Sequence, residues 1–123
     1  MPISVEWENP EQTIMRWTLS GPWTWDEYRQ AQTVSHSLLR SVTHPVDVIA
    51  DMRDAPTLPR DAFSRFKETE VGLPANRSRV ILVTNSMFVR SMAVTFNQVF
   101  LNRPTQFELV ASIEEAHALL AGS

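Results

Sequence analysis

The sequence predicts an α/β fold in which helices cover a mixed, mostly parallel sheet. Residues 46–51 and 80–84 are short, mainly apolar and rich in β-branched side chains, which is typical of strands buried on both faces. Segments with helical spacing alternate with such strands along the chain. Most of the eight prolines lie between these segments rather than inside them. We therefore expect one domain, residues 1–123, with the order β-β-α-β-α-β-α-β-α.

Five segments are expected to form strands. The first two show alternating apolar and polar side chains and are separated by Asn9-Pro10-Glu11, so they should pair as an antiparallel hairpin. The run from Val80 to Val83 contains no polar residue, which predicts that its strand lies at the centre of the sheet. In chain order the expected strands are residues 3–7, 13–19, 46–51, 80–84 and 107–111.

Four helices are expected, and the first has the clearest start signal. Thr24 and Glu27 have the spacing of a capping box, and Trp23 and Tyr28 occupy the two positions of a hydrophobic staple. The expected helices run from the Thr24 cap to near Thr43, from Pro59 to the stop at Gly72, from the Ser86 cap to about Asn102, and from a second capping box at Ser112 and Glu115.

Composition and charge exclude several functions. A formal net charge of −3, from 14 acidic and 11 basic residues, provides no basic surface for nucleic acid or for an anionic membrane. Without cysteine there is neither a disulfide nor a thiolate ligand, which suits a reducing compartment. No apolar run approaches the ~20 residues that span a bilayer, and no secretion signal is recognisable, so we expect a cytoplasmic protein. His36, His44 and His117 lack metal-binding spacing, and we expect neither metal nor cofactor.

The pattern resembles the STAS (sulfate transporter and anti-sigma factor antagonist) domains, and more specifically the SpoIIAA-like group of small bacterial proteins. The likeness rests on residues 19–28 (Leu-Ser-Gly-Pro-Trp-Thr-Trp-Asp-Glu-Tyr), 48–52 (Val-Ile-Ala-Asp-Met) and 112–116 (Ser-Ile-Glu-Glu-Ala), and it covers almost the whole chain. It implies a STAS-like sheet and a non-enzymatic protein that acts by binding other proteins.

In signalling members of that group, a serine in the loop after the third strand is phosphorylated by a partner kinase. The corresponding residues 53–63 contain neither serine nor glycine before Ser64. Thr57, between two prolines, is the nearest hydroxyl and a poor substitute for that serine; it is the candidate phosphorylation site of the loop, and Ser64 lies inside the following helix. We expect that the usual phosphorylation switch is absent.

Polar residues gather where the parallel strands are expected to end, which is where such sheets bind ligands. Helix starts with arginines nearby could bind a small anionic or lipid-like ligand. The competing interpretation is that the serines only cap helices and that the aspartate accepts hydrogen bonds in a turn. The candidate ligand residues are Asp51, Arg53, Asn85, Ser86, Arg90 and Trp25.

The third helix has an apolar face wider than one contact with a sheet needs, which indicates an association surface. Alternatively, the hairpin end and the last helix cover the extra width. The candidate interaction residues are Phe88, Met92, Phe96, Val99 and Phe100. We therefore predict a regulatory or protein-interaction module of STAS type that has no assembled catalytic site. It should form a homodimer or bind another protein. The alternative is a domain that binds a small anionic or lipid-like ligand.

Overall fold

The computed structural model describes residues 2–68, 72–100 and 105–122, and within them it forms a five-stranded sheet in the order β1-β2-β3-β4-β5. β1 (Ile3–Trp7) and β2 (Ile14–Ser20) pair antiparallel, as the sequence predicts. β2, β3 (Val46–Asp54), β4 (Arg77–Val83) and β5 (Phe107–Val110) are all parallel. The predicted mixed, mostly parallel sheet is therefore confirmed.

β3 differs from expectation in two respects. β3 continues to Asp54, beyond the expected end at Asp51, because the strand pairs with Ser20 of β2 past the apolar run. β3 is also the central strand, whereas the sequence predicts β4 in that place. β4 is nevertheless covered on both faces from Val80 to Val83, which explains why its sequence looks like that of a central strand.

The first helix, α1 (Trp25–Arg40), begins as the sequence predicts. The Thr24 hydroxyl accepts the backbone N–H of Glu27 at 3.2 Å, and the Glu27 carboxylate accepts the backbone N–H of Thr24 at 2.8 Å. The staple is also present, because the rings of Trp23 and Tyr28 stack with centroids 5.6 Å apart. Sequence-local hydrogen bonds thus determine where α1 starts.

Replacing Thr24 by alanine should lower the free energy of unfolding by about 1 kcal/mol, because the Glu27 N–H then lacks its capping acceptor. Urea denaturation at neutral pH measures the change. Thr33→Ala is the matched control, since Thr33 is exposed in the middle of α1 and alanine is the better helix former. An equal loss in both variants would contradict a specific capping role.

The remaining helices agree with expectation in number but not in every boundary. α2 (Ala62–Glu68) starts three residues after Pro59, and the predicted continuation over residues 69–71 lies outside the described residues. α3 (Met87–Val99) is capped by Ser86 as predicted. Before α4 (Ile113–Ala121) the Ser112 hydroxyl accepts the N–H of Glu115, but the Glu115 carboxylate accepts the N–H of Ala111, so this capping box is not reciprocal.

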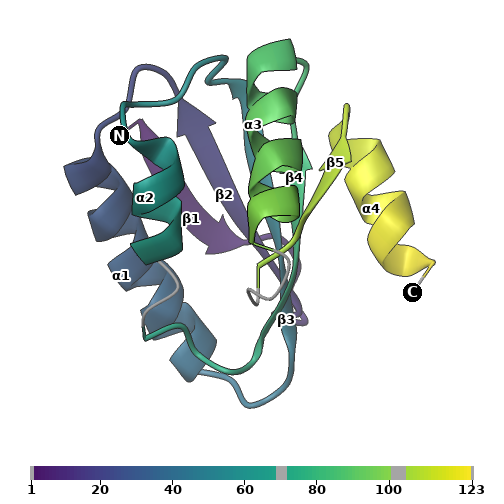
Figure 1. Ribbon diagram of the computed structural model, residues 1–123. Coiled ribbons are helices and arrows are strands. Elements are labelled where there is room, and N and C mark those ends of the chain that lie inside the picture. Colours follow the sequence, from purple (N-terminus) through teal and green to yellow (C-terminus); the bar gives the residue numbers. More distant parts are fainter. Residues whose placement is uncertain (1, 69–71, 101–104, 123) are drawn as a thin grey trace.

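The helices divide unequally between the two faces of the sheet. α1, α2 and α3 cover the front face, which we define by Trp17, Ala50 and Leu82, and they lie before the sheet in Figure 1. Successive right-handed crossovers in one direction along a sheet place their helices on one side, which explains this arrangement. α4 covers the back face through Ala116, against Ile49, Ile81 and Val83.

Candidate functional site

Asp51 is the most buried of the predicted ligand residues, and it lies on the back face. Its side chain is 8% exposed and accepts hydrogen bonds from two arginines on different strands. Arg53 donates to it from Nε and Nη2, both at 2.9 Å, and Arg16 of β2 donates from Nη2 at 2.9 Å. The backbone N–H of Arg53 adds a fourth bond at 3.2 Å. Both carboxylate oxygens of Asp51 therefore already accept hydrogen bonds from within the protein.

The charge state of Asp51 follows from these contacts. The hydrogen bond from the Arg53 side chain is the main reason that the pKa of Asp51 lies below its ordinary value, and Arg16 adds to the effect. A carboxylate that is ionised and paired in this way is a poor proton acceptor. Asp51 thus belongs to an ion-pair network that joins β2 and β3.

The ion pairs continue across the back face beside α4. Arg16 also lies 3.6 Å from Glu8, whose other oxygen lies 2.9 Å from His117 Nε2 on α4. Arg79 and Glu108 form a two-bond pair at 2.8 and 2.7 Å, and this pair lowers the pKa of Glu108. The back face is therefore covered partly by α4 and partly by paired charges.

The other polar residues predicted at the strand ends do not join Asp51. Ser86 accepts the Val89 N–H as the cap of α3 and donates its hydroxyl to the Pro56 carbonyl at 2.7 Å. Asn85 and Arg90 are exposed. Within the described residues no hydrogen bond or ion pair links these three side chains to Asp51 or Arg53. The capping interpretation fits Ser86, and the predicted cluster does not form a single site.

Trp25 lies among aromatic side chains of the front face, not beside Asp51. Its Nε1 donates to the Arg60 carbonyl at 2.8 Å, and its ring meets Trp23 and Phe66 edge-on at 5.0 and 5.2 Å. These contacts attach the start of α1 to α2. Trp25 therefore packs at the start of α1.

The loop after β3 contains the predicted phosphorylation candidate, Thr57. Thr57 and the neighbouring Pro56 are exposed, and the Pro56 carbonyl is bonded to Ser86 at the start of α3. The loop thus lies next to the exposed beginning of α3. Whether Thr57 is modified stays a prediction from the sequence.

The predicted interaction residues of α3 divide between its two sides. Phe88 and Val99 are 50% and 60% exposed, whereas Phe96 is 3% exposed and packs on Phe107 at 5.1 Å. Phe96 is therefore a core residue, and the prediction that it belongs to the surface is wrong. Met92 and Phe100 are half-buried. Successive residues of α3 are rotated by about 100° around its axis. Its apolar residues therefore extend around the helix, and some face the sheet while others face outward.

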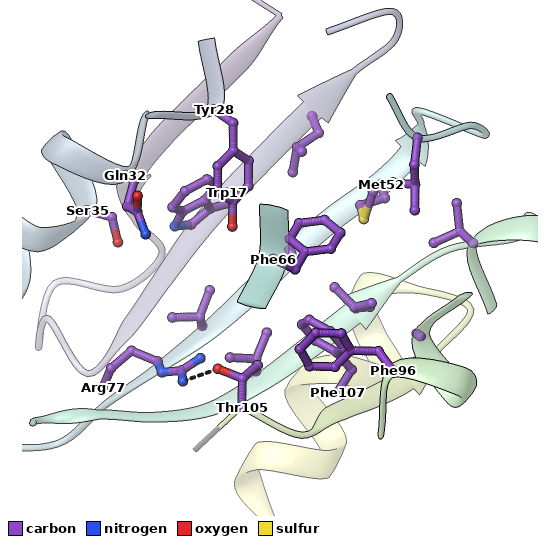
Figure 2. Close-up of a pocket in the computed structure, with 18 of the residues that line it drawn as sticks. Trp17, Tyr28, Gln32, Ser35, Met52, Phe66, Arg77, Phe96, Thr105 and Phe107 are labelled. Carbon is purple, nitrogen blue, oxygen red and sulfur yellow. Dashed lines mark hydrogen bonds between the residues drawn. The ribbon is translucent and has the colours of Figure 1, made fainter. Parts of the chain in front are cut away.

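A cavity of about 130 Å³, which the sequence analysis did not predict, lies under the three front-face helices. Residues of β2 to β5 line it on the sheet side, and residues of α1, α2 and α3 line it on the helix side; Figure 2 shows Phe66 of α2 among the labelled lining side chains. Gln32, Ser35 and His36, polar residues on the inward side of α1, are among the residues that line it. Polar side chains on an otherwise apolar helix stripe could have pointed to this place.

Within the described residues, no helix has the length and hydropathy to cross a bilayer. Across the same residues, no three His, Cys, Asp or Glu side chains are grouped in a way that could hold a metal ion.

The fold defined by this sheet and these helices is SpoIIAA-like. The structure is similar to that of an uncharacterized protein of the DUF3478 family with a SpoIIAA-like fold from Shewanella loihica PV-4, at a TM-score of 0.70 and 16% sequence identity. The similarity covers 96% of this chain and 91% of that chain. The fold inferred from the STAS resemblance is thereby confirmed.

No profile of a known protein family matches the sequence, and no curated protein matches it either.

Proposed function

We propose that the protein is a non-enzymatic interaction module of STAS type that self-associates through the exposed face of α3. The observation that carries the proposal is the exposure of Met87, Phe88, Val94 and Val99, at 75%, 50%, 43% and 60%, on one side of one helix. Large apolar side chains that are exposed together, rather than singly, are typical of association surfaces.

The outer face of α3 is also uncharged. Helical spacing brings the four apolar residues together with Ser91, Thr95 and Gln98, which are exposed as well, while Arg90 lies at the edge. In a chain of net charge −3, this face lets a second copy approach without meeting like charges directly. A twofold contact between two α3 helices is the arrangement that uses the same face on both copies.

The size of this surface implies a weak dimer. A stable interface usually buries about 800 Å² on each partner, and one helix face of 13 residues supplies only part of that. We therefore expect association that depends on protein concentration. A weak homodimer leaves the same face available to a different protein.

The non-enzymatic part of the proposal rests on the state of the ionisable groups. The carboxylates whose pKa values are shifted, Asp51 and Glu108, are both held by arginine side chains. Catalytic acids and bases instead need a pKa suited to proton transfer and a position facing a substrate. The loop threonine, Thr57, replaces the serine of signalling STAS domains, so we propose that partner binding here is independent of phosphorylation.

Sedimentation velocity from low-micromolar to near-millimolar protein tests the proposal. The average mass should rise with concentration, and Phe88→Glu should hold the protein as a monomer because it puts a charge on the apolar outer face of α3. Val34→Glu is the matched control, since Val34 is 47% exposed on α1, away from α3. A wild-type monomer at all concentrations, or equal effects of the two substitutions, would contradict the proposal.

A further inference from the structure

Aromatic rings from five different elements line the cavity under α1, α2 and α3. The ring centroids of Trp17 on β2 and Tyr28 on α1 lie 5.2 Å apart, and Tyr28 lies 5.8 Å from Phe66 of α2. Phe66 in turn lies 6.3 Å from Phe107 of β5 and 6.5 Å from Phe96 of α3, and Figure 2 labels all five rings. Aromatic rings attract one another edge to face or offset at such separations. A further ring placed among them would find the same kind of contact.

The rest of the described lining is mainly aliphatic. β2, β3 and β4 contribute leucine, valine, alanine and methionine side chains, and α3 contributes Val89, Met92 and Ala93. Water does not fill an apolar cavity of this kind, because it needs polar partners there. The space is therefore suited to an apolar molecule.

The polar side chains in the lining have partners within the protein. Ser35 donates its hydroxyl to Met15 Sδ at 3.1 Å. Arg77 and Thr105 are hydrogen-bonded to each other, and both of them, like Gln32, have further interactions. A carboxylate in the cavity would have to compete with these contacts. An amine would meet no acidic side chain among the described residues of the lining.

His36 also lines the cavity, and it is uncharged at neutral pH. Its pKa is lowered from 6.5, chiefly by burial. An ionised group that moves from water into such a place without a free partner of opposite charge pays the full cost of losing its hydration. The lining therefore favours a neutral molecule.

The volume of the cavity limits the size of that molecule. A cavity of about 150 Å³ lined by apolar side chains holds one benzene molecule, and this cavity measures about 130 Å³. One aromatic ring with at most a small substituent is the matching size. A second fused ring would meet closely packed side chains.

We infer that this cavity is a binding site for a small neutral aromatic compound of one ring. The bound ring replaces empty space with dispersion contacts and with edge-to-face contacts to rings such as Tyr28 and Phe66. The site lies on the inner side of α3. It is therefore separate from the outer face of that helix and does not depend on self-association.

NMR titration of the protein with benzene and benzoate tests the inference. The methyl signals of Val80, Leu82 and Val89, which line the cavity, should shift with benzene and reach saturation. Benzoate should bind at least about tenfold more weakly, because its carboxylate loses hydration without gaining a free partner. The absence of saturable shifts with benzene, or equal affinities for benzene and benzoate, would overturn the inference. Shifts confined to Val94 and Val99, which are exposed on α3, would overturn it as well, because they would indicate adsorption to the surface.

A variant with a larger cavity tests the location of the site. Met92 lines the cavity and is half-buried on α3, so Met92→Ala should add apolar space. This variant should bind naphthalene at least about tenfold more tightly than the wild type does, because the second ring can then be buried. Met87→Ala is the matched control, since Met87 is 75% exposed on the same helix, and it should leave the affinity for naphthalene unchanged. Equal affinities of the two variants for naphthalene would overturn the assignment to this cavity.

Discussion

Asp51→Ala should lower the free energy of unfolding by about 3 kcal/mol. The substitution removes the shared acceptor of Arg16 and Arg53 and leaves two guanidinium groups facing each other next to a buried strand. Removing one partner of a buried, hydrogen-bonded charge pair typically costs about 3–5 kcal/mol, and the partial exposure of both arginines brings the loss to the lower end. Urea denaturation at neutral pH measures it.

The loss should depend on pH in a defined direction. Because the pKa of Asp51 is lower in the folded protein, ionised Asp51 contributes its full stability above the unfolded-state pKa of about 3.9. That contribution disappears as the pH falls through the lower, folded-state value. The difference between wild type and Asp51→Ala should therefore be constant near neutral pH and shrink in acid.

Asp54→Ala provides the control for both observations. Asp54 ends the same strand but is exposed, so its loss should change stability by no more than about 0.5 kcal/mol. A small effect of Asp51→Ala together with altered ligand or partner binding would mean that Asp51 is a functional residue and not part of the scaffold.

Phe66→Ala should lower the free energy of unfolding by about 2–3 kcal/mol. The Phe66 ring joins α2 to both neighbouring helices, with its centroid 5.2 Å from Trp25 and 6.5 Å from Phe96. Truncating a fully buried phenylalanine costs about 3–5 kcal/mol, and Phe66 is partly exposed, which reduces the loss. Thermal and urea unfolding both measure it.

Phe88→Ala is the matched comparison, because Phe88 is a phenylalanine on the outer face of α3. Its loss should change the stability of the monomer by less than about 0.5 kcal/mol while weakening self-association. If Phe66→Ala lowered the free energy of unfolding as little as Phe88→Ala, the packing of Phe66 against Trp25 and Phe96 would be contradicted. The position of α2 over the cavity would be contradicted with it.

Features set by nearby residues were predictable from the sequence. The capping box at Thr24 and Glu27, the staple at Trp23 and Tyr28 and the Ser86 cap each depend on groups within five residues of one another. The order of strands and helices follows from the same local patterns. These features are present because short-range hydrogen bonds and apolar spacing decide them before tertiary packing does.

Features set by contacts across the sheet were not predictable. Arg16 pairs with Asp51 only because β2 and β3 lie side by side with Thr18 opposite Asp51, a register that no local pattern specifies. In α3, too, the apolar pattern does not distinguish Phe96, which faces inward, from Phe88, which faces outward. The cavity depends on the fit of side chains from seven elements, so it appears only in three dimensions.

Amide NMR spectra recorded on dilution test the central claim, that the outer face of α3 is the association surface. Dilution from near-millimolar to low-micromolar protein should shift the amide signals of Met87, Phe88, Ser91, Val94 and Val99, and Phe88→Glu should abolish these shifts. Shifts confined to the edge strands β1 or β5, or no dependence on concentration, would contradict the claim.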